Sequence, residues 1–163
     1  VLNLEQRVNF TQSFVNFFIR NLVNEDLGNN WINDIELVDI NNNIYQCKDL
    51  LKDEDCVVVF FPLNACPSCY NIEALKGNSV IKSIILSPLS KYIDLKIDLE
   101  ALEINTNHFA YFENSIPAEL NINNPFIAFW DRTHNKFKYV FIFPKQIQKD
   151  MIELYIDSII KNR

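Results

Sequence analysis

Glycine is almost absent from this sequence of 163 residues, with only Gly28 and Gly77 present. Turns that need a left-handed backbone therefore fall to asparagine, which tolerates that conformation better than other non-glycine residues. Long apolar stretches are lacking too, and none reaches the roughly 20 residues of a membrane-spanning helix. The sequence begins at Val1 and shows no signal peptide. We expect a processed or trimmed piece, from which a leader could have been removed.

Clusters of basic residues are also lacking. The chain has 15 Lys and Arg against 21 Asp and Glu, which gives a net charge of −6 at pH 7. Because binding to nucleic-acid phosphates needs clustered cations, this composition argues against a nucleic-acid partner. The apolar fraction of 48% and the charged fraction of 22% are ordinary for a globular protein. The length suits one domain with its own core.

The most informative stretch of the sequence is CVVVFFPLNACPSC, which runs from Cys56 to Cys69. Its apolar, β-branched first half predicts a strand that is buried on both faces. A short loop follows, and then Cys66-Pro67-Ser68-Cys69. Proline directly after the first cysteine fits the first position of a helix, where its missing N–H costs nothing. Strand, loop and Cys-x-x-Cys at a helix start are typical of a thioredoxin-like redox site.

The segments before this stretch predict a helix and a hairpin. Apolar periodicity favours a helix over residues 4–24. Residues 34–40 and 44–46 alternate and should pair as a β-hairpin, followed by a helical turn over 48–52. Because the first helix carries a second apolar edge, it should pack across the domain, which we favour, or meet a second subunit or a membrane surface.

The segments directly after the cysteines predict two helices and a strand. The first helix should end at Gly77, which is suited to a helix C-terminus. Ser79 can cap a second helix, which ends near Pro88. Residues 92–98 alternate between apolar and charged side chains, which predicts a strand.

The last third of the sequence completes the fold class. Short helices are expected around Leu102 and Phe109. Residues 124–131 and 137–143 read as an antiparallel strand pair, and a final amphipathic helix should span 145–161. The whole order predicts an α/β fold, with a mixed central sheet covered by helices on both faces.

Three pieces of the sequence together resemble a known family: the hairpin at 35–43 with Asp49-Leu50-Leu51, the stretch 57–69, and the strand pair 125–143. They are similar to the thioredoxin superfamily, in its branch of TlpA-like and ResA-like thiol-disulfide oxidoreductases related to the peroxiredoxins. The resemblance implies a thioredoxin-like domain over 31–163 and leaves residues 1–30 as an N-terminal helical extension.

The cysteine pair has a defined chemistry if this resemblance holds. Amides at a helix N-terminus favour the thiolate of Cys66, which would attack a substrate disulfide. Cys69 would then displace the substrate and close an intramolecular disulfide. Pro67 and Ser68 would help set the redox poise and border the substrate. The resemblance implies the reductase direction. Peroxidase activity is disfavoured, because the residues before Cys66 include no Thr or Ser.

Three further residues are candidates for the same site. Pro125 resembles the family's cis-proline, which implies that Asn124 and Pro125 offer backbone to the substrate peptide. A trans proline that simply opens a strand is the alternative. Glu73 follows the cysteines on the predicted helix and could assist proton transfer to or from Cys69, or be a solvated charge.

The remaining cysteines and histidines predict no metal site and no cofactor. A structural zinc site needs two more ligands beside Cys66 and Cys69 at suitable spacing. None of Cys47, Cys56, His108 and His134 shows that spacing. We expect Cys47 and Cys56 to be buried thiols, and both histidines to be ordinary loop residues.

The resemblance also implies partners and a location. It implies protein thiols or disulfides as substrates, a thiol electron donor, and a bacterial, periplasmic or extracytoplasmic setting, with anchoring through a removed N-terminal segment left open. A homodimer is left open as well. The alternative function is a thioredoxin-like binding or assembly module with weak or no catalysis. Ala65, where the family usually has tryptophan, motivates this alternative.

Overall fold

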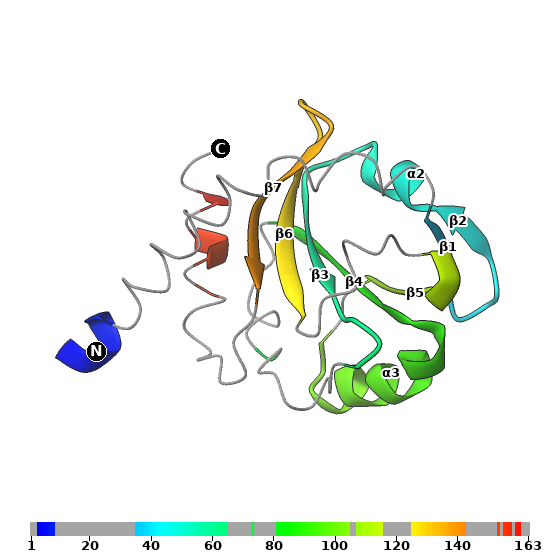
Figure 1. The fold of residues 1–163 in the computed structure, drawn as a ribbon, viewed down its shortest axis with the longest axis horizontal. Coiled ribbons are helices and arrows are strands. Elements are labelled where there is room, and N and C mark those ends of the chain that lie inside the picture. The colour runs from blue at the N-terminus through cyan, green and yellow to red at the C-terminus, as the bar shows by residue number, and fades with distance from the viewer. Residues whose placement is uncertain are drawn as a thin grey trace.

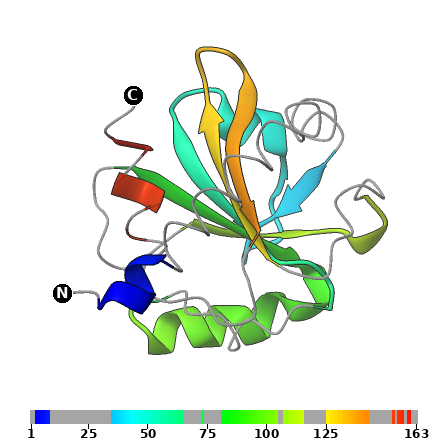
Figure 2. The ribbon, with the colours of Figure 1, turned by 60° about the vertical axis from the view of Figure 1, so that its left-hand side comes forward.

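The fold is an α/β sandwich around one mixed sheet. This computed structural model describes residues 3–8, 35–64, 73, 81–104, 107–115, 125–142, 153, 155–157 and 159–160. Seven strands form the sheet in the order β2-β1-β5-β4-β3-β6-β7. Figures 1 and 2 show these strands lying between α2 (Cys47–Leu51) and α3 (Tyr92–Ala101). The predicted class, a mixed sheet with flanking helices, is confirmed.

The strand β3 (Cys56–Phe60) is an interior strand of the sheet, between β4 and β6, and all five of its residues are buried. It pairs in parallel with β4 (Lys82–Pro88) and antiparallel with β6 (Phe126–Asp131). The prediction of a strand buried on both faces is therefore confirmed, and helices cover both faces of it.

The outer strands extend the sheet on both sides. On one side β5 (Asn107–Tyr111) runs parallel to β4, and the hairpin of β1 (Glu36–Val38) and β2 (Ile44–Gln46) adds antiparallel to β5. On the other side β7 (Lys136–Ile142) pairs antiparallel with β6. Both antiparallel pairings expected from the sequence are present, and α2 begins one residue before its predicted start. The 3-10 turns η5 (Leu89–Lys91) and η6 (Glu113–Ser115) follow β4 and β5.

Asparagine takes left-handed positions in both hairpin turns. Asn42 has φ of 62° in the β1–β2 turn, and Asn135 has φ of 49° in the β6–β7 turn. These are positions where glycine is the usual residue. The role assigned to asparagine from the scarcity of glycine is confirmed at these two sites.

The predicted elements between residues 79 and 111 are wrong. Residues 82–88 form the strand β4 instead of a helix, and 92–101 form α3 instead of a strand. Phe109 lies in the strand β5, and Leu102 lies in the turn that ends α3. Both faces of β4 are buried, with Ile85 on one face and Ile84 and Leu86 on the other, so its sequence carries no period of two.

Two apolar clusters pack against the two faces of the sheet. On one face α3 and the helical residues near the C-terminus contact the sheet, through residues that include Leu95, Tyr155 and Ile159. On the other face α2 contacts it, and this cluster includes Cys47 and Leu51 of α2 and Trp130 of β6. In the predicted final helix Tyr155, Ile156 and Ile159 are buried, as expected.

Cys47 and Cys56 are free, buried thiols in the second cluster, as predicted. Burial raises the pKa of each to about 12. Both sulfurs are therefore protonated near neutral pH, which leaves them without the nucleophilic thiolate form.

The N-terminal helix is described only at residues 4–8. The Asn3 side chain accepts from the amide of Gln6 at 2.8 Å, and the Gln6 side chain accepts from the amide of Asn3 at 2.9 Å, a reciprocal capping arrangement. Leu4 and Val8 are 78% and 59% exposed, so the expected packing across the domain is wrong for these two residues. Across the described parts of the chain, no helix has the length and apolar character to cross a membrane. The remainder of the predicted helix, beyond residue 8, lies outside the described residues.

A buried hydrogen bond joins α2 to the sheet. The indole Nε1 of Trp130 on β6 donates to the carbonyl oxygen of Leu51, at the end of α2, over 2.7 Å. Trp130 is 5% exposed and makes an edge contact with Phe137 on β7. The bond satisfies a carbonyl that the helix itself cannot satisfy at its C-terminus.

We predict that Trp130→Phe lowers the free energy of unfolding by about 1–3 kcal/mol, because it leaves the Leu51 carbonyl without its donor in the core. Urea unfolding followed by far-UV circular dichroism measures this. The matched control is Ile44→Ala at a 62% exposed position on β2, which should change stability by less than about 0.5 kcal/mol. An equal, small effect of both substitutions would contradict the role given to the indole.

Candidate functional site

The candidate site lies at one edge of the sheet, where four strand ends meet. Because β3, β4 and β5 are parallel, their carboxyl ends share this edge, and antiparallel β6 begins there. Ligand sites of open α/β sheets form outside the carboxyl ends of the strands. The chain leaves β3 here through Phe61 and Pro62, and the turn at 63–64 leads toward the cysteines.

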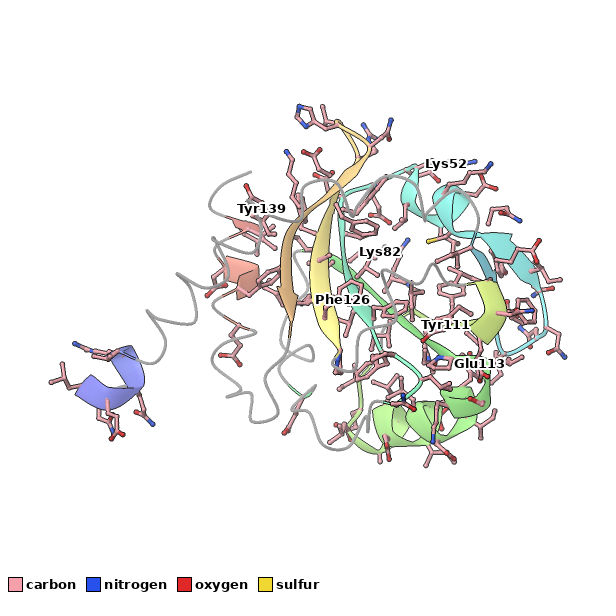
Figure 3. The ribbon with its side chains drawn as sticks, viewed as in Figure 1. Lys52, Lys82, Tyr111, Glu113, Phe126 and Tyr139 are labelled. Atoms are coloured by element: carbon pink, nitrogen blue, oxygen red, sulfur yellow. The ribbon has the colours of Figure 1, made fainter. Side chains whose placement is uncertain are left out.

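A stack of aromatic rings holds the end of β3 in place. The ring of Phe60 stacks on Tyr111 at 4.9 Å and 4°, and on Phe126 at 4.9 Å and 22°. The Tyr111 hydroxyl donates to the carbonyl oxygen of Phe61 over 2.6 Å, and the Phe61 amide donates to the carbonyl of Leu86 over 2.9 Å. Figure 3 labels Tyr111 and Phe126 beside this strand. The backbone is therefore fixed up to the residue before Pro62.

Tyr111 keeps its proton under all ordinary conditions. Burial, assisted by the nearby charge of Glu113, raises the pKa of its hydroxyl above the usual value. The group is thus a permanent donor to the Phe61 carbonyl. Sequence reasoning missed this residue, because it lies in the region where the expected elements were wrong. The alternating segment His108-Phe109-Ala110-Tyr111 was the available signal.

The predicted site residues are only partly within the described chain. Cys66, Pro67, Ser68, Cys69 and Asn124 lie outside the described residues. Their roles, and the cis form of the Asn124–Pro125 bond, therefore stay predictions.

Pro125 and Glu73 are described. Pro125 is buried directly before β6. Phe60 is opposite Phe126 in the β3–β6 register, so the next pair along is Phe61 and Pro125. The structure therefore brings Pro125 beside the segment that leads to Cys66. Glu73 is exposed, which suits a solvated charge, and its role in proton transfer stays a prediction.

A cluster of polar side chains lies on the neighbouring strands β4 and β5. His108 is a strand residue of β5, so its prediction as a loop residue is wrong. Its Nε2 lies 2.7 Å from the hydroxyl of the fully buried Ser87, and its ring stacks on Tyr92 at 4.2 Å. Within the described part of the chain, no polar group lies within hydrogen-bonding distance of its buried Nδ1.

This environment keeps His108 neutral. Burial, followed by the charge of Lys96, lowers the pKa of the imidazole to about 4. Protonation would place a cation in this buried site, where none of the described acidic side chains pairs with it, which is costly. Ser87 follows Leu86, the neighbour of Phe60 across the β3–β4 ladder, so the cluster lies close to the end of β3.

His134 lies in the 132–135 turn, as predicted, at the opposite edge of the sheet. Its Nδ1 is 2.7 Å from the Asp131 carboxylate, which the ammonium of Lys138 also contacts. Burial alone raises the pKa of Asp131, but hydrogen bonds from Lys138 and His134 outweigh it and leave this pKa well below its usual range. This group fastens the β6–β7 hairpin. Among the described residues no cluster of three metal-ligating side chains occurs.

We predict that His108 makes the fold sensitive to mild acid. Its pKa is about 4 in the folded chain against the ordinary value of 6.5 for histidine, so its contribution to stability is complete above pH 6.5 and is lost as the pH falls toward 4. The expected loss is about 3 kcal/mol across the window. Asp131, with its lowered pKa, contributes only below this window. Urea unfolding at a series of pH values measures the effect.

The control for this prediction is His108→Gln, which can still hydrogen-bond to Ser87 but does not titrate. Its stability should change less than that of the wild type between pH 6.5 and 4. Parallel acid dependence in the two proteins would contradict the assignment to His108.

Comparisons by sequence find nothing: no family model matches the chain, and no curated protein matches it either. Comparisons of structure do find similar folds. A secreted Mycobacterium tuberculosis disulfide oxidoreductase homologous to E. coli DsbE superposes with a TM-score of 0.61 at 10% sequence identity, over 79% of this chain and 98% of that one.

Two further structures agree with the first. MTB DsbF gives a TM-score of 0.55 at 11% identity, over 80% of this chain and 98% of that one. A thiol:disulfide interchange protein of the thioredoxin family from Chlorobium tepidum gives 0.50 at 12% identity, over 76% and 90%. The chain thus has the thioredoxin-like fold that these DsbE-like and thioredoxin-family proteins share.

Proposed function

We propose that this chain is a thiol-disulfide oxidoreductase that acts through Cys66 and Cys69 on protein disulfides. The observation that carries the proposal is the position of Cys-Pro-Ser-Cys in the sequence, a short loop after the buried strand β3 of a thioredoxin-like fold. A fold alone hosts many functions, so the argument depends on the cysteines and on what surrounds them.

The topology supports a helix that begins at Pro67. Residues 61–81 connect β3 to the parallel strand β4. A parallel connection of this length is usually a crossover helix. Such a helix would present its unpaired amides and the positive end of its dipole to Cys66, and both lower the pKa of a thiol.

The exchange runs in three balanced steps. The Cys66 thiolate attacks one sulfur of the substrate disulfide, which releases one substrate thiolate and forms a mixed disulfide. Cys69 then attacks the Cys66 sulfur, which releases the second substrate thiol and closes the Cys66–Cys69 disulfide. A thiol donor returns two electrons to this disulfide. We propose the reductase direction, in which electrons flow from the donor to the substrate.

The other two cysteines are unsuited to this chemistry. Burial raises the pKa of Cys47 and of Cys56 to about 12, which leaves almost no thiolate at neutral pH. The burial of Cys47 and Cys56 supports Cys66 and Cys69 as the pair that we propose for the reaction, among the four cysteines of the chain.

The surroundings proposed for the cysteines come from four strand ends. Tyr111 fixes the backbone at Phe61, and Pro125 lies beside that backbone across the sheet. In the proposed complex the backbone of Asn124 and Pro125 pairs with the substrate peptide, and Pro67 and Ser68 border it. A similar protein is described as secreted, which supports an extracytoplasmic location for this chain.

The central experiment traps the mixed disulfide. Cys69→Ser should accumulate adducts through Cys66 when the protein is mixed with a disulfide-bonded substrate such as insulin, because the resolving thiol is gone. Cys66→Ser should lower insulin reduction by a factor of at least about 100, because the nucleophile is lost. The measurements are non-reducing gel electrophoresis and insulin turbidity with dithiothreitol as the donor.

The matched control is Cys47→Ala, which removes a thiol that the proposed reaction does not use and should retain the activity of the wild type. Absence of adducts, together with a Cys66 that alkylates no faster than free cysteine, would overturn the proposal. The reduction potential of the Cys66–Cys69 pair, measured against glutathione, decides between the reductase and oxidase directions.

The second candidate is a binding or assembly module on the same fold. The observation in its favour is the apolar outer face of α3, where Ile93 and Ile97 are exposed. This function predicts a complex that survives alkylation of both Cys66 and Cys69, whereas an exchange enzyme loses its partners under that treatment.

A further inference from the structure

The carbonyl group of Phe61 lacks its regular partner in the sheet. In the parallel β3–β4 ladder Phe60 is opposite Leu86, so Phe61 and Ser87 form the next pair along. The bonds of a parallel ladder are slanted, so each residue donates to the residue before its partner and accepts from the residue after it. Phe61 makes the first of these bonds, from its amide to the carbonyl of Leu86 over 2.9 Å. The second would come from the amide of Pro88, and proline has no N–H.

Tyr111 supplies the missing donor from a strand that is not adjacent to β3. The strand β4 lies between β5 and β3, and Tyr111 is opposite Pro88 at the end of β5. Its ring stacks on Phe60, and its hydroxyl donates to the carbonyl oxygen of Phe61 over 2.6 Å. Tyr111 and Phe61 are each 1% exposed, so the bond lies in a place closed to solvent. Phenylalanine would serve the packing equally well, so the hydrogen bond is what tyrosine adds at this position.

This bond fixes the direction in which the chain leaves the sheet. The bond from its amide to Leu86 limits φ of Phe61. Because the peptide unit is planar, the bond from Tyr111 to its carbonyl limits ψ of the same residue. The ring of the buried Pro62 then fixes the next φ at about −65°. Without the tyrosine hydroxyl, ψ of Phe61 is the angle in this series that becomes free.

A rotation about ψ of Phe61 displaces the residues that follow it. Cys66 is five positions further on in the sequence, a reach of at most about 17 Å. On an arm of about 10 Å, a rotation of about 10° displaces an atom by about 2 Å. Pro125 lies on the strand across the ladder and does not move with this rotation. The rotation therefore changes the distance between the proposed nucleophile and the backbone proposed to bind the substrate.

We propose that Tyr111 is a positioning residue for Cys66, which it holds in place beside Pro125 through the carbonyl group of Phe61. The inference rests on the proposed thiol-disulfide exchange and adds a residue of β5 to it. The helix proposed to begin at Pro67 moves together with Cys66, so the thiolate keeps the stabilisation that the helix provides. Loss of the hydroxyl therefore slows reactions in which a protein substrate must also bind at Pro125.

Tyr111→Phe tests the role of the hydroxyl, because it keeps the aromatic stack and removes only the hydrogen bond. Insulin reduction should fall at least about tenfold, since a displacement of about 1 Å can cost about 100-fold in rate. Alkylation of Cys66 by iodoacetamide, measured in the Cys69→Ser background, should stay within about twofold of its value with Tyr111 present. This small reagent needs the thiolate but no bound substrate peptide, so a change in position affects it little.

The matched control is Tyr155→Phe. The Tyr155 hydroxyl also donates to a backbone carbonyl, that of Tyr139 on the edge strand β7, over 2.7 Å. This variant should lose stability as Tyr111→Phe does but should keep the insulin reduction of the wild type. Urea unfolding followed by far-UV circular dichroism compares the stabilities and shows that each variant is folded under the assay conditions.

A second substitution tests whether the hydrogen bond is the cause. Pro88→Ala restores an N–H at the position from which the ladder bond to Phe61 should come. Residue 88 has φ of −59° and ψ of 146°, which alanine also adopts. The double variant Tyr111→Phe/Pro88→Ala should therefore recover most of the insulin reduction that Tyr111→Phe loses.

The outcomes separate this inference from the proposed function. Equal insulin reduction by Tyr111→Phe and the wild type would overturn the inference alone. So would an equal loss in Tyr155→Phe, a parallel fall of alkylation and insulin reduction, or a double variant no better than Tyr111→Phe. A wild type that neither reduces insulin nor forms trapped adducts would overturn the proposed function, and this inference with it.

Discussion

The pairing of β3 on both of its sides is the constraint on which the rest of the structure depends. A strand in the middle of a sheet must pair every backbone group with its neighbours, because no water reaches it. Here one register aligns Phe60 with Leu86 on β4 and with Phe126 on β6. That alignment alone brings the exit of β3, the end of β4 and Pro125 to one edge. The candidate site is therefore a product of strand pairing before any side-chain chemistry is considered.

Burial then decides which polar groups can act at that edge. It keeps the Tyr111 hydroxyl protonated and so makes it a permanent donor to the Phe61 carbonyl. It keeps His108 neutral and the thiols of Cys47 and Cys56 unreactive. All three effects have one cause, the cost of placing a charge in an apolar interior. A reactive cysteine in such a chain must therefore lie where water or the N-terminus of a helix stabilises the negative charge of its thiolate.

The sequence alone predicts an element correctly where one face of that element is polar or where a recognisable motif lies in it. The hairpin pairs β1–β2 and β6–β7, the buried strand β3 and the free thiols were all predictable, because alternation, turn residues and apolar runs are local signals. Between residues 82 and 101 the prediction placed a helix where β4 lies and a strand where α3 lies. The first error arose because β4 carries apolar residues on both faces. The bonds of Tyr111 to Phe61 and of His108 to Ser87 join residues 50 and 21 positions apart, and no local pattern reports such contacts.

The error at α3 has a physical meaning of its own. A helix at the surface of a monomer should show apolar residues on one face only. Ile93 and Ile97 break that rule, and with Leu95 they imitate the alternation of a strand. Sequences depart from local rules mainly where a function or a partner requires it. The two isoleucines that concealed the helix therefore leave its outer face apolar and exposed.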